Sequence, residues 1–245
     1  MPEVILHLAI LILAFLYSSV GHAGASGYIA AMTLASIAIE EIRPAALMLN
    51  LGVAVFGIWN FVRGGHFRWH LIWPFLPLAL PCAWLGARIE LPTSVISILL
   101  GAVLLFSAIR FLRRQADERS ECKRPSIWAS LVVGALLGFL AGMTGTGGGI
   151  FLTPLLLWLG WAQPKTAAAA SIVFIAGNSL FGLAAFGMQQ TLPWPLMTLL
   201  PLALIGGFAG SRLGSFKFAP NTIRRLLSAV LILAAFKLLY GGIAP

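Results

Sequence analysis

The sequence predicts an all-α polytopic membrane protein built from two related halves. Composition is the first observation, because the 245-residue chain is 60% hydrophobic and only 9% charged, with a mean hydropathy of +0.96, whereas soluble domains carry about 25% charged residues. The second is the length of the apolar runs, and the third is a glycine-rich pattern that occurs in each half. The runs do not alternate polar with apolar residues, which excludes an outer-membrane barrel.

Charged and turn-forming residues cut the chain into apolar runs of about the length that spans a bilayer, roughly 20 helical residues. The expected spans are 45–62, 71–89, 95–112, 167–188, 196–213 and 226–240. We expect Pro44 to start the first span, because a first helical turn does not need the N–H that proline lacks. Pro74, Pro77 and Pro81 predict kinks in the second span.

Two further apolar segments are interrupted by small residues. Segment 4–39 is broken at 18–27, and segment 127–159 is broken by the glycine-rich stretch 142–149. Each glycine costs about 1 kcal/mol relative to alanine in a helix interior. In hydrocarbon, backbone groups freed by a break cost several kcal/mol each unless protein or water satisfies them. Breaks of this kind at membrane depth indicate a binding site.

The polar segment 113–126 divides the chain into an N-terminal repeat, 1–112, and a C-terminal repeat, 127–245. Two collinear matches support an internal duplication: 21–27 with 142–148 at a separation of 121 residues, and 77–88 with 201–212 at a separation of 124. The domain organisation is therefore two repeats in one transmembrane domain, joined by a linker that we expect to be cytoplasmic.

The positions of lysine and arginine decide how the repeats are oriented, since cytoplasmic loops carry these residues in excess. With the linker inside, a hairpin at 127–159 keeps the basic loop 212–225 inside, whereas a single crossing would place it outside. Counting back, 63–70 is inside and 40–43 outside. The second repeat is thus inverted relative to the first, and each contains a re-entrant broken hairpin plus three transmembrane helices. The Lys and Arg residues outside this pattern are Arg43, Arg88 and Lys237.

Inverted repeats with broken helices are typical of secondary transporters. Successive glycine N–H groups at the start of a helical arm form a concave donor surface, and the helix dipole adds about half a positive charge. Two such arms entering from opposite faces would bind a small anion at the midplane. The predicted binding residues are Thr144, Gly145, Thr146, Gly147, Gly148 and Gly149 in the second half, His22, Gly24, Ser26 and Gly27 in the first, and Asn50 and Asn178 in spans.

Several of these residues have a second interpretation. His22 could bind substrate, carry a proton, or only hydrogen-bond the bent backbone. The two asparagines could join helices instead of lining a site. Arg88 and Arg212 are either interfacial anchors or anion-attracting residues at the two mouths. Gly-x-x-x-Gly spacing explains two further glycine pairs as helix packing, at 134/138 and 206/210.

The absence of acidic residues from the predicted spans limits the kinds of ligand that we expect. All seven acidic residues lie in loops or at span boundaries, whereas a cation transporter usually places a carboxylate at membrane depth. The two cysteines form neither a disulfide framework nor a metal-binding spacing, and we expect no metal and no cofactor. The net charge of +9 comes from short loops, so the partners are an anion and the lipid bilayer and not a nucleic acid. A homodimer is compatible with the sequence, which shows no interface for one.

Two other functions stay open on these residues. One is an anion channel. The other is an intramembrane hydrolase in which Ser18, Ser19 or Ser26 would act with His22.

The stretch 142–156 (GMTGTGGGIFLTPLL) resembles the hallmark of the TauE/SafE family of sulfite and organosulfonate exporters. Other segments resemble further landmarks of that family: 24–32, 43–47, Asn50, 81–86 and 170–179. The resemblance covers nearly the whole chain. It implies a bacterial inner-membrane permease, not an enzyme, that exports sulfite, thiosulfate or an organosulfonate. Residues 23–26 (AGAS) depart from the fuller glycine run of the family, which sets the first half-site apart from the second.

Overall fold

The computed structural model describes residues 3–89, 98, 101–102, 104–106, 108–109, 122–123, 125–188 and 193–243. These residues form helices α1 (Glu3–Ser19), α2 (Ala25–Leu34), α3 (Ile39–Arg63), α4 (Trp69–Ile72), η1 (Trp73–Phe75), α5 (Leu76–Ala87), α7 (Ile127–Thr144), α8 (Gly149–Trp158), α9 (Pro164–Gly187), η2 (Trp194–Leu199), α10 (Leu200–Arg212), η3 (Leu213–Lys217) and α11 (Pro220–Ile243). Most of the predicted span 95–112 and of the predicted linker 113–126 lies outside the described residues.

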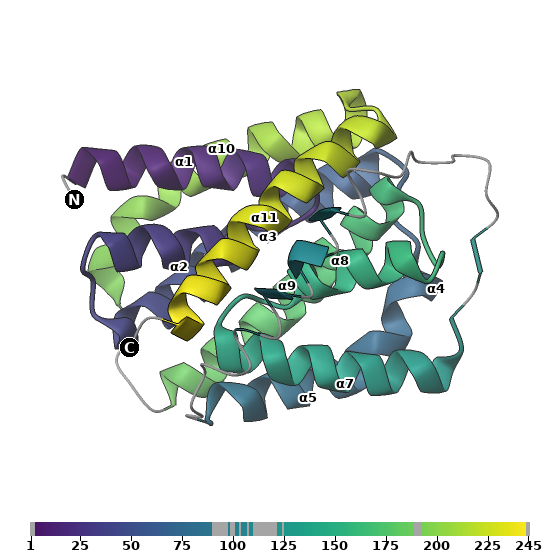
Figure 1. The fold of residues 1–245 in the computed structure, drawn as a ribbon, viewed down its shortest axis with the longest axis horizontal. Helices are drawn as coiled ribbons and strands as arrows, with labels where there is room; N and C mark the ends of the chain where they lie inside the picture. Colours follow the sequence, from purple (N-terminus) through teal and green to yellow (C-terminus); the bar gives the residue numbers. More distant parts are fainter. Residues whose placement is uncertain are drawn as a thin grey trace.

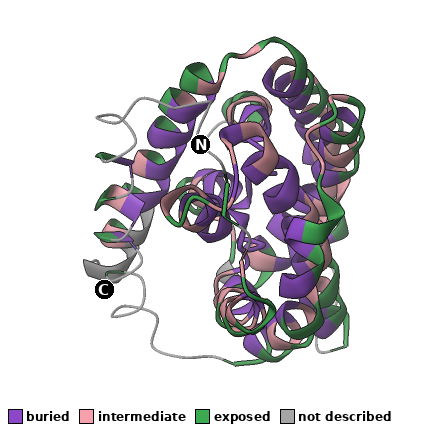
Figure 2. Cartoon of the chain, turned by 90° about the vertical axis from the view of Figure 1, so that its right-hand side faces the viewer, coloured by how far each residue is buried: buried purple, intermediate pink, exposed green. Residues whose placement is uncertain are grey.

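Five described segments are long and apolar enough to cross a membrane: Glu40–Arg63, Trp69–Ala87, Ile127–Thr144, Pro164–Gly187 and Trp194–Lys217. Buried residues face the middle of the helix bundle and exposed residues face outward (Figure 2). On α7 the outward face is itself apolar, because Trp128, Val132 and Leu136 are more than half exposed at a spacing of four residues. An apolar outer surface fits contact with lipid, and the predicted all-α membrane fold is confirmed.

Two details of the predicted spans can be compared with the observed helices. The first long helix, α3, begins at Ile39 and not at Pro44, so that predicted start is wrong. Glu40 and Glu41 occupy its first turn, where the positive end of the helix dipole favours acidic side chains. The predicted kink at Pro74 is confirmed, because this residue lies in a short 3₁₀ turn that separates α4 from α5.

Both broken segments fold back on themselves. In Figure 1, α1 runs from the N-terminus at the left edge toward the middle, and α2 returns to the left. The arms α7 and α8 mirror this arrangement, since α7 starts at the right edge and α8 returns there. The first arms have 17 and 18 residues, and both second arms have 10. The two hairpins therefore run in opposite directions in this view.

A constant separation of 124 residues relates the elements of the two halves. Arms α2 and α8 have this separation at both ends. The positive-φ residues share it in three pairs: Gly21 with Gly145, Gly24 with Gly148, and Ser36 with Gly160. The predicted separation of 121 in the glycine-rich stretches is wrong. That alignment matched glycine identities, whereas the turns are matched by backbone conformation.

Glycines allow two helix pairs to pack backbone against backbone. The pairs are α5 with α7 and α1 with α10. On α7, a Cβ at Gly134 would collide with the carbonyl oxygen of Phe75, and one at Gly138 with that of Ala79. On α10, a Cβ at Gly206 would collide with the carbonyl oxygen of Leu11, and one at Gly210 with that of Phe15. The predicted packing role of these four glycines is confirmed. Helices α3 and α9 pack against each other between the two pairs.

Candidate functional site

The two hairpin breaks are buried, and one side chain of α3 joins them. Asn50, which is fully buried, accepts a hydrogen bond at Oδ1 from the backbone N–H of Ala25, the first residue of α2, at 3.0 Å. Its Nδ2 lies 3.4 Å from the carbonyl oxygen of Thr146 in the second break and 3.4 Å from Ser179 Oγ on α9. One amide therefore links the start of α2, the second break and the neighbouring long helix.

Asn178 of α9 holds the second break from the other side. Its Nδ2 donates to the carbonyl oxygen of Gly147 at 3.3 Å, while its buried Oδ1 has no hydrogen-bond partner among the described residues. A Cβ at Gly147 would lie 2.9 Å from Asn50 Nδ2 and 3.0 Å from Ser179 Oγ. The positive φ of Gly147, 75°, and the crowding by polar groups both favour glycine here.

His22, in the first break, reaches across to the second hairpin. Its Nε2 lies 2.8 Å from Thr153 Oγ1 on α8, and the Thr153 hydroxyl donates to Ser171 Oγ on α9 at 2.6 Å. All three side chains are at most 2% exposed. Thr153 and Ser171 were not predicted as site residues. For Thr153 the available signal was that it is the one hydroxyl residue of the otherwise apolar arm 149–158.

Other predicted residues of the breaks make local contacts. The Ser26 hydroxyl donates to Tyr17 Oη at 3.0 Å, within the first hairpin. Thr144 donates to the carbonyl oxygen of Leu140 and lies 2.8 Å from the Thr146 hydroxyl. Gly24 and Gly148 have left-handed backbone conformations and directly precede α2 and α8. The Cβ position of Gly27 faces Leu13 and Tyr17, and that of Gly149 faces Ile175.

Arg43, near the start of α3, lies beside the second break and was not predicted as a site residue. Its Nη2 donates to the carbonyl oxygen of Gly142 at 3.0 Å, its guanidinium stacks on Phe186 at 5.0 Å, and a Cβ on Gly145 would lie 3.3 Å from Arg43 Cβ. The sequence did single out Arg43 in one respect, because it is one of the three Lys and Arg residues that do not lie on the predicted cytoplasmic side.

Arg88 and Arg212 do not join this cluster. Both are exposed at helix ends and stack on aromatic residues four positions earlier, Arg88 on Trp84 at 3.6 Å and Arg212 on Phe208 at 5.9 Å. These contacts agree with the interpretation as interfacial anchors; the alternative as mouth residues stays a prediction.

The electrostatics around the breaks come from dipoles, hydrogen-bonding groups and the Arg43 guanidinium beside the second break, with no carboxylate among the described residues. The acidic residues that the structure describes, Glu3, Glu40 and Glu41, are all exposed. Ser18 Oγ and His22 Nδ1, like Asn178 Oδ1, are buried without a partner among the described residues. Each such atom costs about 1–3 kcal/mol, so this region holds hydrogen-bonding capacity that a ligand can use. The described residues contain no cluster of metal-ligating side chains.

Comparison with known proteins gives this site a family context. The family model described as "Sulfite exporter TauE/SafE" matches residues 6–238. The chain belongs to the TauE/SafE family. A relative from Sinorhizobium fredii, "Probable membrane transporter protein y4hK", is 37% identical over 244 residues, which cover 96% of this chain and 97% of that protein.

More distant relatives match shorter parts of this TauE/SafE chain. "Probable membrane transporter protein YjnA" from Bacillus subtilis is 36% identical over 31% of this chain and 29% of its own. "Probable membrane transporter protein MJ0441" from Methanocaldococcus jannaschii is 27% identical over 60% of this chain and 58% of its own. No solved structure matches the chain. The protein is thus a multi-pass membrane transporter of the TauE/SafE type.

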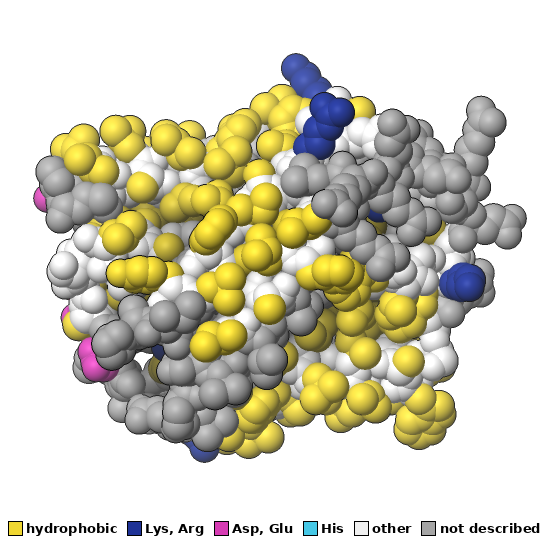
Figure 3. All heavy atoms as spheres, in the orientation of Figure 1, with side chains coloured by type: hydrophobic (Ala, Val, Ile, Leu, Met, Phe, Trp, Pro, Cys, Tyr) yellow, Lys and Arg dark blue, Asp and Glu magenta, His cyan; other side chains and the backbone are white. Residues whose placement is uncertain are grey.

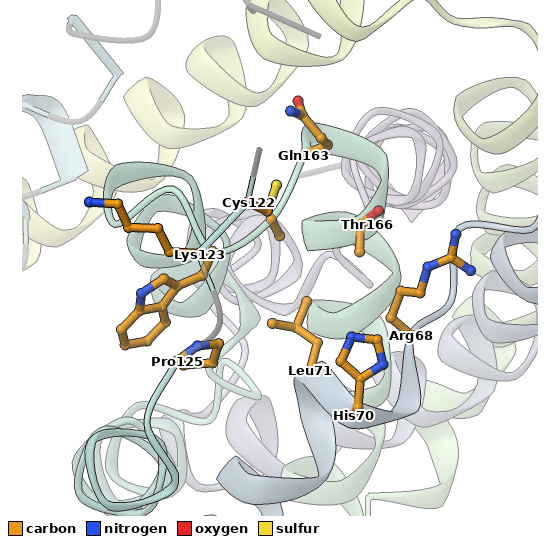
Figure 4. Close-up of a pocket in the computed structure, with 10 residues that line it drawn as sticks. Arg68, His70, Leu71, Cys122, Lys123, Pro125, Gln163 and Thr166 are labelled. Carbon is orange, nitrogen blue, oxygen red and sulfur yellow. The ribbon is translucent and has the colours of Figure 1, made fainter. Parts of the chain in front are cut away.

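A cavity of about 200 Å³ in this TauE/SafE transporter lies away from the breaks, between α4, the start of α9 and the residues Cys122, Lys123 and Pro125 (Figure 4). Arg68 and Lys123 line it, but their charged ends point to opposite sides.

Nearby, His66 Nε2 lies 2.9 Å from the carbonyl oxygen of Ser215. Burial lowers the pKa of His66, and Lys165 and Arg68 lower it further, so this imidazole is neutral near pH 7 and donates to Ser215.

Proposed function

We propose that this protein is a secondary transporter that exports a small anion, in particular sulfite, thiosulfate or an organosulfonate. The observation that carries the proposal is the bridge made by Asn50 between the start of α2 and the break of the second hairpin. This bridge brings both predicted half-sites to one buried place. The description of the family as sulfite exporters supports the sulfur anion and the direction.

The physics of the breaks favours a negatively charged ligand. The N-terminus of a helix carries roughly half a positive charge and presents unpaired N–H groups. Asn50 Oδ1 accepts the Ala25 N–H in the way an oxygen of an oxyanion would. No acidic side chain of the described residues is buried near it, so an anion entering this region meets dipoles and amides and no like charge.

The proposed topology has two inverted repeats in the bacterial inner membrane, with the linker in the cytoplasm. The directions of the two hairpins in Figure 1 support this arrangement. Figure 3 adds the charges: acidic side chains lie at the left edge, Lys and Arg project at the top and at the right edge and also at the lower left, and hydrophobic side chains cover much of the face between. Under the positive-inside rule the right-hand end is cytoplasmic.

The hydrolase alternative named three serines, and none of them pairs with His22. The Ser19 hydroxyl donates to the carbonyl oxygen of Leu16 and the Ser26 hydroxyl to Tyr17, while Ser18 Oγ has no partner among the described residues. None of the three serines is hydrogen-bonded to His22, which a serine nucleophile would need.

The test is anion flux into proteoliposomes that contain the purified full chain. Sulfite, thiosulfate, sulfoacetate and taurine are offered separately, and we expect saturable flux of at least one, stimulated when the same anion is present on the opposite side. Absence of flux for all four, with folded protein, rejects the proposal. Flux that does not saturate identifies a channel instead.

Two asparagines of α3 provide a matched pair of variants for this assay. Asn50→Ala removes the bridge between the breaks. Asn60→Ala removes an equally buried amide that lies 2.8 Å from Ser211 Oγ on α10, away from the breaks. Both variants lose buried hydrogen bonds worth about 1 kcal/mol each, but we expect only Asn50→Ala to lose more than about tenfold in anion affinity. Equal losses of transport would mean that Asn50 acts through stability alone.

A further inference from the structure

We propose that His22 carries the coupling proton of transport. In this inference, which rests on the proposed anion transport, His22 takes up a proton at Nδ1 as the anion binds and releases it with the anion. One proton thus moves with each anion, in the same direction. With a dianion such as thiosulfate the pair carries one net negative charge, so an inside-negative membrane potential drives it outward, as export requires. The protonated ring would offer its new N–H to the anion, and the proton returns to water on the side where the anion leaves.

The hydrogen bonds of His22 identify the atom that takes the proton. Because the Thr153 hydroxyl donates to Ser171 Oγ, its oxygen is an acceptor toward His22 Nε2 at 2.8 Å. In a neutral imidazole one nitrogen is a donor and the other an acceptor. Nε2 therefore carries the hydrogen, and the lone pair lies on Nδ1, which is buried without a partner among the described residues.

Comparison of the two halves shows that packing alone does not require this chain of polar groups. The residues 124 positions before Thr153 and Ser171 are Ile29 and Leu47, which are buried and apolar. At 124 positions after His22 stands Thr146, a side chain that does not titrate. The fold thus fills the places equivalent to Thr153 and Ser171 with apolar side chains, so a hydrogen-bonded chain like His22–Thr153–Ser171 cannot form at the equivalent positions.

The surroundings of His22 make its protonation depend on an anion. The groups placed against the ring are the Thr153 hydroxyl, the Tyr17 ring at a centroid distance of 6.5 Å and the backbone of Gly149, all of them uncharged. An isolated imidazolium in a medium of low dielectric constant is unfavourable, and a nearby anion offsets that cost. Since such coupling is reciprocal, a proton on His22 favours anion binding and the anion favours protonation.

The experiment uses full-length protein in proteoliposomes with thiosulfate and sulfoacetate as probes, because their charge stays constant near neutral pH. With the membrane potential clamped at zero by valinomycin and equal potassium on both sides, a pH gradient of about one unit should concentrate a probe about tenfold on the alkaline side if one proton moves with each anion. A pH-sensitive dye inside the vesicles should report proton movement when the anion is added. This measurement on the unchanged protein does not depend on whether any variant folds.

Three variants complete the test. His22→Gln should lose the accumulation driven by the pH gradient, and any exchange of anion for anion that it keeps should no longer depend on pH. Thr153→Val, which frees the ring from its partner, should shift the pH dependence of flux without removing it. The exposed His70→Gln, at one end of the molecule, should behave like the unchanged protein.

The outcomes separate the two proposals. Absence of anion flux in the unchanged protein rejects the transport function itself. Flux with no proton movement, flux driven by a sodium gradient alone, or pH-driven accumulation that persists in His22→Gln leaves the transporter in place and overturns the role of His22.

Discussion

Arg43 places a formal positive charge beside the second hairpin break. Its side chain contacts Gly142 and faces Gly145. At the start of the first break, Gly21 faces Ala168 instead. Because the anion carries the opposite charge, Arg43 is positioned to attract it at the second break.

We therefore expect Arg43→Gln to raise the apparent KM for the anion by about tenfold, since hydrogen bonds and charge attraction of this kind contribute about 1.5–3 kcal/mol. Arg43→Lys should recover part of the affinity, which separates the charge from the structural contact with Gly142. Arg63→Gln is the control, because Arg63 ends the same helix and stacks on Trp59 at 4.2 Å. KM values are measured by initial flux in proteoliposomes, and an unchanged KM in Arg43→Gln would contradict the role.

Sequence alone predicted some of the polar residues that enter the core, but not all of them and not their partners. Asn50 and Asn178 stood out as amides in apolar spans, and the structure brings both to the second break. The pairing of His22 with Thr153 joins residues 131 positions apart, and such a contact depends on how the hairpins meet. Ser26 was predicted to face the ligand, but its hydroxyl is bound to Tyr17, a contact between the two arms that spacing does not show.

At the scale of elements, the glycines have two separate uses. In the breaks they adopt left-handed backbone conformations, which cost other residues about 1–2 kcal/mol. In α7 and α10 they are helical and allow a neighbouring backbone to come close. Helix association in lipid depends on such close packing, so this second use supports the hairpins that carry the site.

We expect Gly138→Ala to lower the apparent melting temperature of the detergent-solubilised protein, because the new Cβ collides with backbone atoms of Ala79 and overpacking costs about 1–3 kcal/mol. Gly210→Ala, against Phe15, should lower it similarly. Gly187→Ala is the control: no described heavy atom lies within 4 Å of its Cβ position, and alanine favours the helix by about 1 kcal/mol. Equal melting temperatures for all three would refute the packing role.

The elements themselves were largely predictable because each leaves a physical signature. The spans were predicted from the charged residues at their ends and the length of the apolar runs, and the hairpins were predicted from the glycine-rich breaks. The start of α3 was misplaced because Glu40 and Glu41 indicate water and also suit a first helical turn. The two breaks were aligned at the wrong separation because a glycine in the sequence can mean two things. It can adopt a left-handed backbone conformation, as Gly148 does, or it can be helical and leave room for a close neighbour, as Gly149 does.

For the molecule as a whole, the constant separation of 124 residues makes the proposed inversion testable. Ser36 follows α2 and Gly160 follows α8, and both are exposed with similar positive φ, 58° and 66°. Ser36 shows that this conformation accepts a side chain, so cysteine can be placed at both positions under matched backbone constraints. In parallel repeats the two would lie on the same side of the membrane, and in inverted repeats on opposite sides.

We expect Ser36→Cys to react with a membrane-impermeant maleimide in intact cells and Gly160→Cys to react only in inside-out vesicles. Both variants are made in a chain in which Cys82 and Cys122 are replaced by serine, because Cys122 is itself exposed. Cys122 in the otherwise unchanged chain should label like Gly160→Cys, since Lys123 N bonds the Gly160 carbonyl at 2.8 Å and holds the two segments together. Labelling of Ser36→Cys and Gly160→Cys from one side would rule out inversion, and the two helix breaks would then enter from the same face and could not form the proposed site between them.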